Sequence, residues 1–157
     1  MENYVVKIEL AEKAESARIR TVKLLLEAES YTDAEKKAFE VYEEQFRDDY
    51  DTPNVASINP TKFSLTHDLV KPEEVEDGSV EYARIYHVKA GVVFKGEAGK
   101  RVAKILVCRA YSIEDAIKHG KKHLEKFYQA ESVTVLESKE TDLHPESPVF
   151  AIVAEDE

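Results

Sequence analysis

The residues of this chain with the clearest potential for chemistry are basic and aromatic side chains interleaved between positions 87 and 111. Single-stranded nucleic acids bind surfaces of this composition, because cations lie near the phosphates and rings stack on unpaired bases. Eight residues therefore form a candidate nucleic-acid surface: His87, Lys89, Lys95, Lys100, Arg101, Lys104, Arg109 and Tyr111. A basic hairpin that only balances an acidic neighbour explains the same pattern without any ligand.

A second candidate surface is acidic and lies in the first half of the chain. The net charge of −10 is carried by residues 1–82, whereas residues 83–157 are neutral overall and contain a basic segment, 84–126. A basic protein partner would contact the acids of the first half: Glu35, Glu40, Glu43, Glu44, Asp48 and Asp49. Self-association between the acidic half of one copy and the basic segment of another is a further possibility, and it would build rings or filaments.

Motifs of the common enzyme classes are missing from the sequence. There is no glycine-rich phosphate loop and no GxSxG turn. The single cysteine, Cys108, lies in an apolar strand pattern and is expected to be a small buried hydrophobe. His119 and His123 are four residues apart, but Gly120 replaces the glutamate of HExxH and three lysines crowd the pair, which disfavours a metal. We expect no catalysis, no cofactor and no metal.

The elements that would position these residues follow from an internal repeat. Residues 4–46 align without a gap to residues 86–128, and 12 of the 43 pairs are identical, whereas unrelated segments would share roughly two or three. Each copy has a strand of period two, a polar turn, a second strand, a serine-capped helix and a third strand. The expected fold class is α+β: a tandem, pseudo-twofold duplication of a β-β-α-β module with mostly antiparallel sheets and one helix per repeat.

The two copies are expected to contain the same elements in the same order. The first copy has strands at Tyr4–Leu10 and Ile19–Ala28, a helix after Ser30, and short strands at Val55–Ile58 and Phe63–Leu65. The second has strands at Tyr86–Phe94 and Val102–Ala110, a helix after Ser112 and a strand at Val133–Leu136. Glycines in the turn at 95–99 are free to adopt positive φ.

The domain organisation follows from the repeat. We expect a first repeat at 1–70, an acidic linker at 71–82 and a second repeat at 83–157, packed as one unit because each core alone is thin. The stretch 148–157 is expected to be an edge strand, with an acidic docking tail as the alternative. No apolar run approaches the ~20 residues of a membrane span, and the N-terminus lacks a signal-peptide pattern. We expect a cytoplasmic protein without membrane contact.

Five blocks of the sequence form a recognisable pattern: Tyr4–Ile8, Lys23–Ala28, Ser30–Glu35, Val55–Ser64 and Tyr86–Lys89. In this order they resemble an uncharacterised domain family of Bacteroidetes and their phages. The chain departs from the family pattern at Ile85-Tyr86, where members often have an aromatic pair. The resemblance implies a bacterial or phage setting in the cytoplasm and implies no particular activity.

These observations favour a non-enzymatic binding protein over an enzyme. One hypothesis is that it binds single-stranded nucleic acid through the basic hairpin of the second repeat. The other is that it is a protein-interaction or inhibitory module that uses the acidic first repeat.

Overall fold

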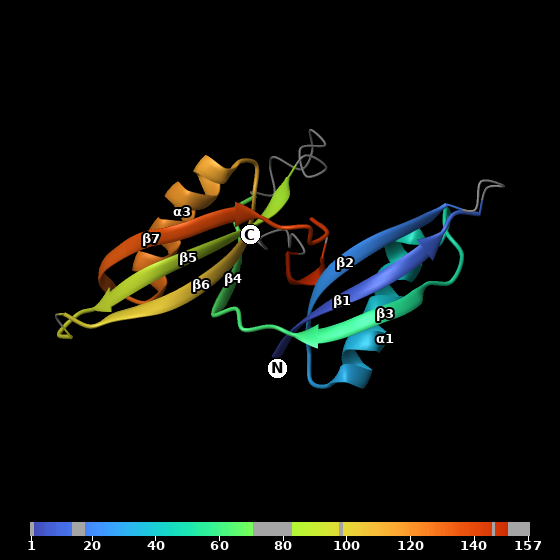
Figure 1. Cartoon of the computed structure of the whole chain (residues 1–157), viewed down its shortest axis with the longest axis horizontal. Helices are drawn as coiled ribbons and strands as arrows, with labels where there is room; N and C mark the ends of the chain where they lie inside the picture. The colour runs from blue at the N-terminus through green and yellow to red at the C-terminus, as the bar shows by residue number, and fades with distance from the viewer. Residues whose placement is uncertain (1, 14–17, 71–82, 98, 146, 151–157) are drawn as a thin grey trace, which may run out of the picture. The chain divides into compact units, whose positions relative to one another are not determined.

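The computed structural model describes residues 2–13, 18–70, 83–97, 99–145 and 147–150 of the 157-residue chain. These described residues divide into two compact units, the first formed by those up to Lys62 together with 147–150 and the second by those from Phe63 to Pro145. The described residues form an α+β fold with two α-helices and two mostly antiparallel sheets (Figure 1). Neither of these helices is long and apolar enough to cross a membrane.

The first unit is a three-stranded antiparallel sheet with a helix on one face (Figure 1). Its elements are β1 (Glu2–Ala11), β2 (Ile19–Ala28), α1 (Tyr31–Val41), the π-helical turn η1 (Tyr42–Phe46) and β3 (Asn54–Pro60), and the strand order is β2-β1-β3. Every second residue of β1 from Tyr4 to Leu10 is buried. Because successive strand side chains point to opposite faces, this alternation directs one apolar face at α1, where Ala34 and Ala38 complete the core.

The second unit is a four-stranded sheet, also with a helix on one face (Figure 1). Its elements are β4 (Leu65–Asp68), β5 (Arg84–Phe94), β6 (Arg101–Ala110), α3 (Ile113–Phe127) and β7 (Ala130–Glu140), in the order β4-β6-β5-β7. β4 runs parallel to β6, and the other pairs are antiparallel. Val88, Leu106 and Leu124 are fully buried at the centre of its core.

The strand pairs of the two sheets match in register. The matching pairs are Tyr4–Leu26 with Tyr86–Cys108, and Val6–Leu24 with Val88–Leu106. The central strand of each sheet also shifts its register against the third strand directly after a lysine, Lys7 in β1 and Lys89 in β5. Two antiparallel strands, a helix and a third strand therefore follow one another in each unit.

The fourth strand of the second unit begins two residues after the expected position. A short strand was expected at Phe63–Leu65, and β4 occupies Leu65–Asp68. These residues fall in the range 1–70 expected for the first repeat, yet they pair with β6. Leu65 packs against the core of the second unit, which explains this placement.

Two segments with sequence-based expectations lie outside the described residues. They are the acidic linker at 71–82 and the last residues, 151–157. The described start of the C-terminal stretch, Pro148–Phe150, is a 3-10 helix, η3.

Both α-helices begin at the predicted serine caps. The Ser30 hydroxyl accepts a hydrogen bond from the Asp33 backbone N–H, and Ser112 does the same for Asp115, each at 3.1 Å. Such caps satisfy backbone N–H groups that have no partner inside the helix. The predicted caps are therefore confirmed.

Removing either cap is expected to cost a similar amount of stability. Ser30→Ala and Ser112→Ala should each lower the free energy of unfolding by about 1 kcal/mol, because one backbone N–H loses its acceptor. Urea unfolding followed by circular dichroism measures the loss. Ser132→Ala, at an exposed position of β7, is the control and should change stability by less than about 0.5 kcal/mol. A cap variant as stable as this control would contradict the prediction.

Candidate binding surfaces

The β5–β6 hairpin distributes the eight basic and aromatic candidates over more than one surface. Tyr86 and Val88 pack in the core beneath α3, so His87 and Lys89 point to the opposite face of the sheet, which we call the open face because α3 does not cover it, although Ile85 and Val107 are buried on it. Both side chains are partly buried there. Burial, and then the charge of Lys139, lower the pKa of His87. His87 is therefore neutral at pH 7 and adds no cation to the open face.

Arg101 and Lys104 lie on opposite faces of the same sheet. The Arg101 side chain crosses the open face directly over Gly91, since a Cβ added to this glycine would lie 2.3 Å from Arg101 Cδ. Lys104 instead points to the helix side, where its Nζ is 5.3 Å from the centre of the Tyr128 ring. A single nucleic-acid strand on one face cannot contact both.

Two more of the eight candidate residues are exposed cations at the tip of the β5–β6 hairpin. Lys95 and Lys100 are exposed in the turn, where Gly96 and Gly99 have φ of 83° and 87°. This confirms the expectation of positive φ at these glycines. Tyr111 follows β6 and packs against Val70 and Ala83, so most of its ring is not available for stacking on a base.

Arg109 has a structural role that removes it from the surface. Its side chain is 2% exposed, and its Nε donates to an Asp68 oxygen at 3.0 Å, while a second guanidinium nitrogen contacts the other Asp68 oxygen. The third nitrogen donates to the Pro145 carbonyl at 2.9 Å. The parallel pairing of β4 with β6 places Asp68 directly beside Arg109. Arg109 is therefore unavailable for phosphate contacts.

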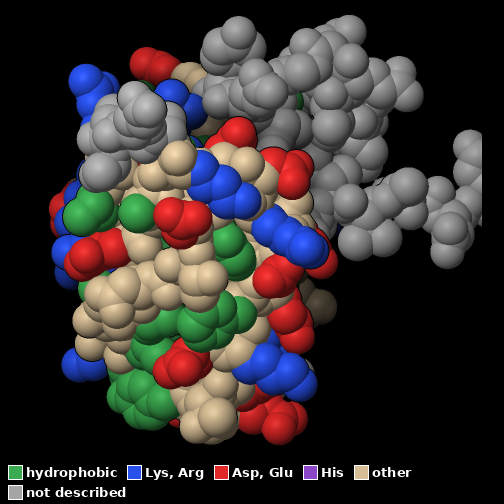
Figure 2. All heavy atoms as spheres, turned by 90° about the vertical axis from the view of Figure 1, so that its right-hand side faces the viewer, with side chains coloured by type: hydrophobic (Ala, Val, Ile, Leu, Met, Phe, Trp, Pro, Cys, Tyr) green, Lys and Arg blue, Asp and Glu red, His purple; other side chains and the backbone are tan. Residues whose placement is uncertain are grey.

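The six acidic candidates of the first unit are all exposed. They lie on α1, on η1 and in the turn that follows: Glu35, Glu40, Glu43, Glu44, Asp48 and Asp49. Glu43 forms a surface ion pair with Arg47 at 3.2 Å. On the face shown in Figure 2, acidic side chains are interspersed with basic and apolar ones. A basic partner would therefore contact small local groups of acidic side chains on this unit.

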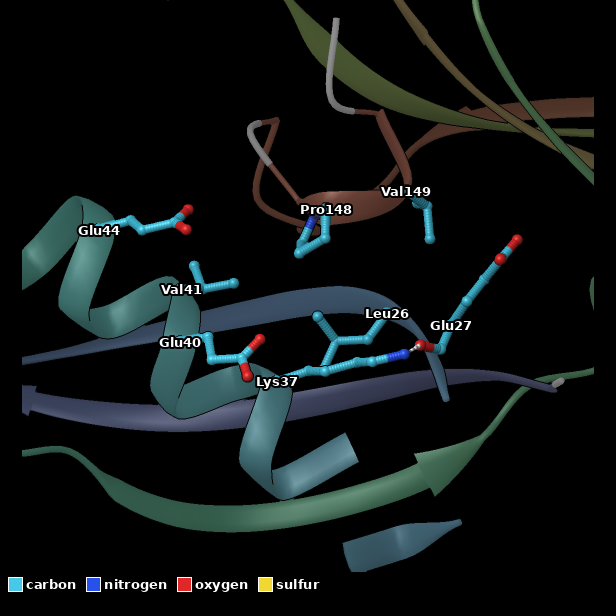
Figure 3. Close-up of a pocket in the computed structure, with 8 residues that line it drawn as sticks. All are labelled: Leu26, Glu27, Lys37, Glu40, Val41, Glu44, Pro148 and Val149. Carbon is cyan, nitrogen blue, oxygen red and sulfur yellow. Dashed lines mark hydrogen bonds between the residues drawn. The ribbon is translucent and has the colours of Figure 1, made fainter. Parts of the chain in front are cut away.

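One such group borders a pocket in the first unit. The pocket has a volume of about 330 Å³ and is lined by Leu26, Glu27, Lys37, Glu40, Val41, Glu44, Pro148 and Val149. Figure 3 shows the side chains of Glu40 and Val41 of α1 and of Glu44 of η1 directed toward the space below Pro148, with Leu26 beneath it. We call this the acidic groove: it has apolar walls and two carboxylates on one side.

Of the charged side chains that line the acidic groove, Lys37 has hydrogen-bond and ion-pair partners, whereas Glu40 and Glu44 form no ion pair among the described residues. Lys37 Nζ donates to the Glu27 carbonyl at 2.7 Å and lies 3.4 Å from the Asp33 carboxylate. Within the described parts of the chain, neither Glu40 nor Glu44 forms an ion pair. Two like charges four residues apart on a helix repel each other. The groove therefore presents two carboxylates, Glu40 and Glu44, that form no ion pair with a described residue.

Comparison with known proteins places the chain in a family. Residues 3–145 match the family described as Domain of unknown function (DUF4494). The chain belongs to this family. No curated protein matches it. The family therefore supports the expectation of an uncharacterised domain.

The second unit of this DUF4494 domain contains a polar pocket that was not predicted. It has a volume of about 470 Å³ and is lined by His67, Asp68, Leu69, Ala110, Tyr111, Asp115 and His119. Next to it, the rings of His67 and His123 stack with centroids 3.6 Å apart. Three or more metal-ligating side chains do not come together anywhere among the described residues. His123 packs against His67 through this ring contact.

The stacked pair is expected to make stability depend on pH. Burial lowers the pKa of both His67 and His123 below 6.5; each is neutral in the folded state at pH 7, and the charge of His67 further disfavours protonation of His123. Near pH 6.5 the two histidines take up protons in the unfolded chain but not in the folded chain. The free energy of unfolding is therefore highest above this pH and falls as the pH drops below it. The free energy of unfolding between pH 7.5 and 5.0 measures this loss.

A ring-conserving variant isolates the two histidines from other titrating groups. His67→Phe with His123→Phe keeps two stacked rings but cannot take up protons, so its stability should fall less over the same pH range. Equal pH slopes in the two proteins would contradict the assignment. The adjacent Asp68 charge opposes the effect at His67, so we expect His123 to contribute most.

Cys108 is confirmed as a buried core residue. It lies in β6 within the core of the second unit, and its thiol is free. Burial raises the pKa of Cys108 to about 12. A thiol with this pKa stays protonated at pH 7 and is a poor nucleophile.

The sequence contained little information on the acidic groove. Glu40 and Glu44 were recognised only as acids of the first half. Leu26 lies in a predicted strand, Val41 follows Ser30 in a predicted helix, and Pro148 begins the C-terminal stretch. No local pattern predicts that residues 148–149 line a pocket with α1 and β2, because this contact joins distant parts of the chain.

Proposed function

We propose that this DUF4494 domain is a non-catalytic protein-binding module whose first unit docks a basic segment of a partner. The acidic groove carries this proposal: Glu40 and Glu44 are exposed beside an apolar-walled pocket and form no ion pair among the described residues. Cationic side chains with apolar stems match such a site, because the stem contacts the walls while the charge reaches a carboxylate.

A partner-capture experiment tests this function. The tagged wild-type protein should retain one stoichiometric protein from a lysate of its host, and retention should weaken with added salt. A variant with all six acids changed to amides should lose that protein: Glu35, Glu40, Glu43 and Glu44 to Gln, and Asp48 and Asp49 to Asn. Equal retention by this variant would reject the acidic surface as the docking site.

Nucleic-acid binding is the second candidate, and the open face of the second sheet favours it. Lys89 and Arg101 lie on this face, and Lys95 and Lys100 lie at the adjoining turn. This set lacks Arg109 and Lys104 and is smaller than the eight residues expected from the sequence. A labelled single-stranded oligonucleotide should bind with a steep salt dependence, and Lys100→Glu with Arg101→Glu should abolish binding. Binding that survives this double charge reversal would reject the open face.

We also propose that the chain arose by tandem duplication of a β-β-α-β module. The 12 identities over residues 4–46 and 86–128, the matching strand registers and the two equivalent serine caps support this origin. The resemblance to proteins of Bacteroidetes and their phages favours a bacterial or phage protein of the cytoplasm. The pseudo-twofold packing of the repeats and assembly into homo-oligomers stay predictions.

A further inference from the structure

The first sheet ends in β2, whose outer edge pairs with no described strand but is contacted by Ser147 and by the 3-10 helix η3. β2 is terminal in the order β2-β1-β3. Two of its outward-directed backbone groups bond to side chains: the Leu25 N–H donates to the Ser147 hydroxyl at 3.0 Å, and the Glu27 carbonyl accepts from Lys37 Nζ at 2.7 Å. Unpaired strand edges of this kind are templates for the addition of another strand.

The second sheet shows what the equivalent edge can bind. β6 corresponds to β2 by register, and its outer edge carries the parallel strand β4. Backbone bonds join the two at both ends, from Ser64 N–H to the Ile105 carbonyl at 2.9 Å and from Leu69 N–H to the Arg109 carbonyl at 3.0 Å. Glu27 holds the place in β2 that Arg109 holds in β6. In the first sheet the Glu27 carbonyl accepts a hydrogen bond from the Lys37 ammonium, whereas in the second sheet the equivalent Arg109 carbonyl accepts one from Leu69, just after β4.

We infer that the β2 edge and the acidic groove together bind an extended, arginine- or lysine-bearing segment of a partner polypeptide. This inference rests on the proposed protein-binding function and specifies its ligand. Backbone groups of the segment would form hydrogen bonds with the Leu25 N–H and the Glu27 carbonyl. They would replace the Ser147 hydroxyl and the Lys37 ammonium as partners of these two groups. Strand addition of this type draws affinity from main-chain hydrogen bonds and specificity from side-chain pockets.

The groove selects the side chain that the segment carries. Pro148 and Val149, whose side chains are accessible in the groove, offer apolar contact to the stem of an arginine, and Glu40 and Glu44 offer carboxylates to its guanidinium. Planar guanidinium groups bind carboxylates through paired hydrogen bonds, which favours arginine over lysine. The bound cation also relieves the repulsion between the two glutamates.

A defined peptide tests this inference on the full chain. The probe is a fluorescein-labelled octapeptide of alternating valine and arginine, and the matched peptide has glutamate in place of arginine. Fluorescence anisotropy should show saturable binding of the first peptide only. Glu40→Gln with Glu44→Gln should weaken binding at least about tenfold. Glu29→Gln with Glu131→Gln removes the same charge from exposed positions outside the groove and should leave affinity unchanged.

Methylation of the probe tests the backbone contact without altering the protein. Two versions are made, one methylated on alternate amides of one strand edge and one on the other edge. A strand added to β2 uses only one edge, so one version should lose at least about tenfold in affinity and the other should retain it. Equal binding of the two versions, or binding that Glu40→Gln with Glu44→Gln leaves intact, would overturn the inference.

Two further outcomes separate this inference from the proposed function. If the peptide fails to bind while acid-dependent capture of a partner protein persists, the groove is not the site and the proposed function stands. If both fail, both are rejected. A dimer mass in sedimentation, with dimers that Glu40→Gln and Glu44→Gln disrupt and the peptide does not, would identify a second copy as the occupant and overturn the inference.

Discussion

Asp68→Ala is expected to lower the free energy of unfolding by about 3 kcal/mol. Asp68 is the carboxylate partner of Arg109, whose side chain is 2% exposed and has its remaining bond to the Pro145 carbonyl. Removing one member of a buried ion pair leaves the other charge without compensation, which costs roughly 3–5 kcal/mol. We take the lower end of this range because the Asp68 side chain is 20% exposed. Urea unfolding followed by circular dichroism measures the change.

Two comparisons make this prediction specific. Glu131→Ala removes an exposed carboxylate from β7 and should change stability by less than about 0.5 kcal/mol. Arg109→Met combined with Asp68→Ala removes both charges, so it should recover most of the loss. An Asp68→Ala variant that is as stable as Glu131→Ala would show that the ion pair does not hold β4 on the sheet.

Leu106→Ala is expected to cost about 3 kcal/mol of stability. Leu106 is fully buried between the sheet and α3, and a Cβ added at Gly120 of α3 would lie 3.1 Å from its Cδ2. The α3 backbone at Gly120 already lies close to the sheet, so neighbouring groups cannot move far to fill the cavity that the shortened side chain would leave. Truncation of a buried leucine to alanine costs about 2–5 kcal/mol, and more where the cavity persists.

The matched control for this truncation is the same substitution on the surface. Leu136 of β7 is 48% exposed, so Leu136→Ala should cost well under about 1 kcal/mol. Urea unfolding of both variants gives the comparison. Similar losses in the two proteins would contradict the placement of Leu106 at the centre of the core.

Local sequence patterns predicted most elements of this fold. The alternation in Tyr4–Leu10 gave a strand with one buried face, and Ser30 and Ser112 gave the helix starts, because these signals depend only on neighbouring residues. Cys108 was assigned to the core from the apolar strand around it. Each of these features is encoded within about ten residues of sequence.

Contacts between distant residues were not predictable in the same way. Arg109 was taken as a surface cation, but β4 supplies Asp68 from 41 positions away and buries the pair. His123 of α3 likewise stacks on His67 of β4, which lies in a distant part of the sequence. Ser147 bonds Leu25 across 122 positions. No periodicity records such pairings, and they decide which charged residues remain available for ligands.

The most direct test of the account is a hydrogen-exchange footprint of the complex with the captured partner protein. Amide exchange of the full chain is compared with and without the partner. If the partner docks on the β2 edge and the acidic groove, amide exchange should slow at Leu25 and Glu27 of β2 and along α1, with the β5–β6 hairpin unchanged. Slower exchange confined to the hairpin around Lys89 and Arg101, with β2 and α1 unaffected, would contradict the claim that the acidic first unit is the binding surface.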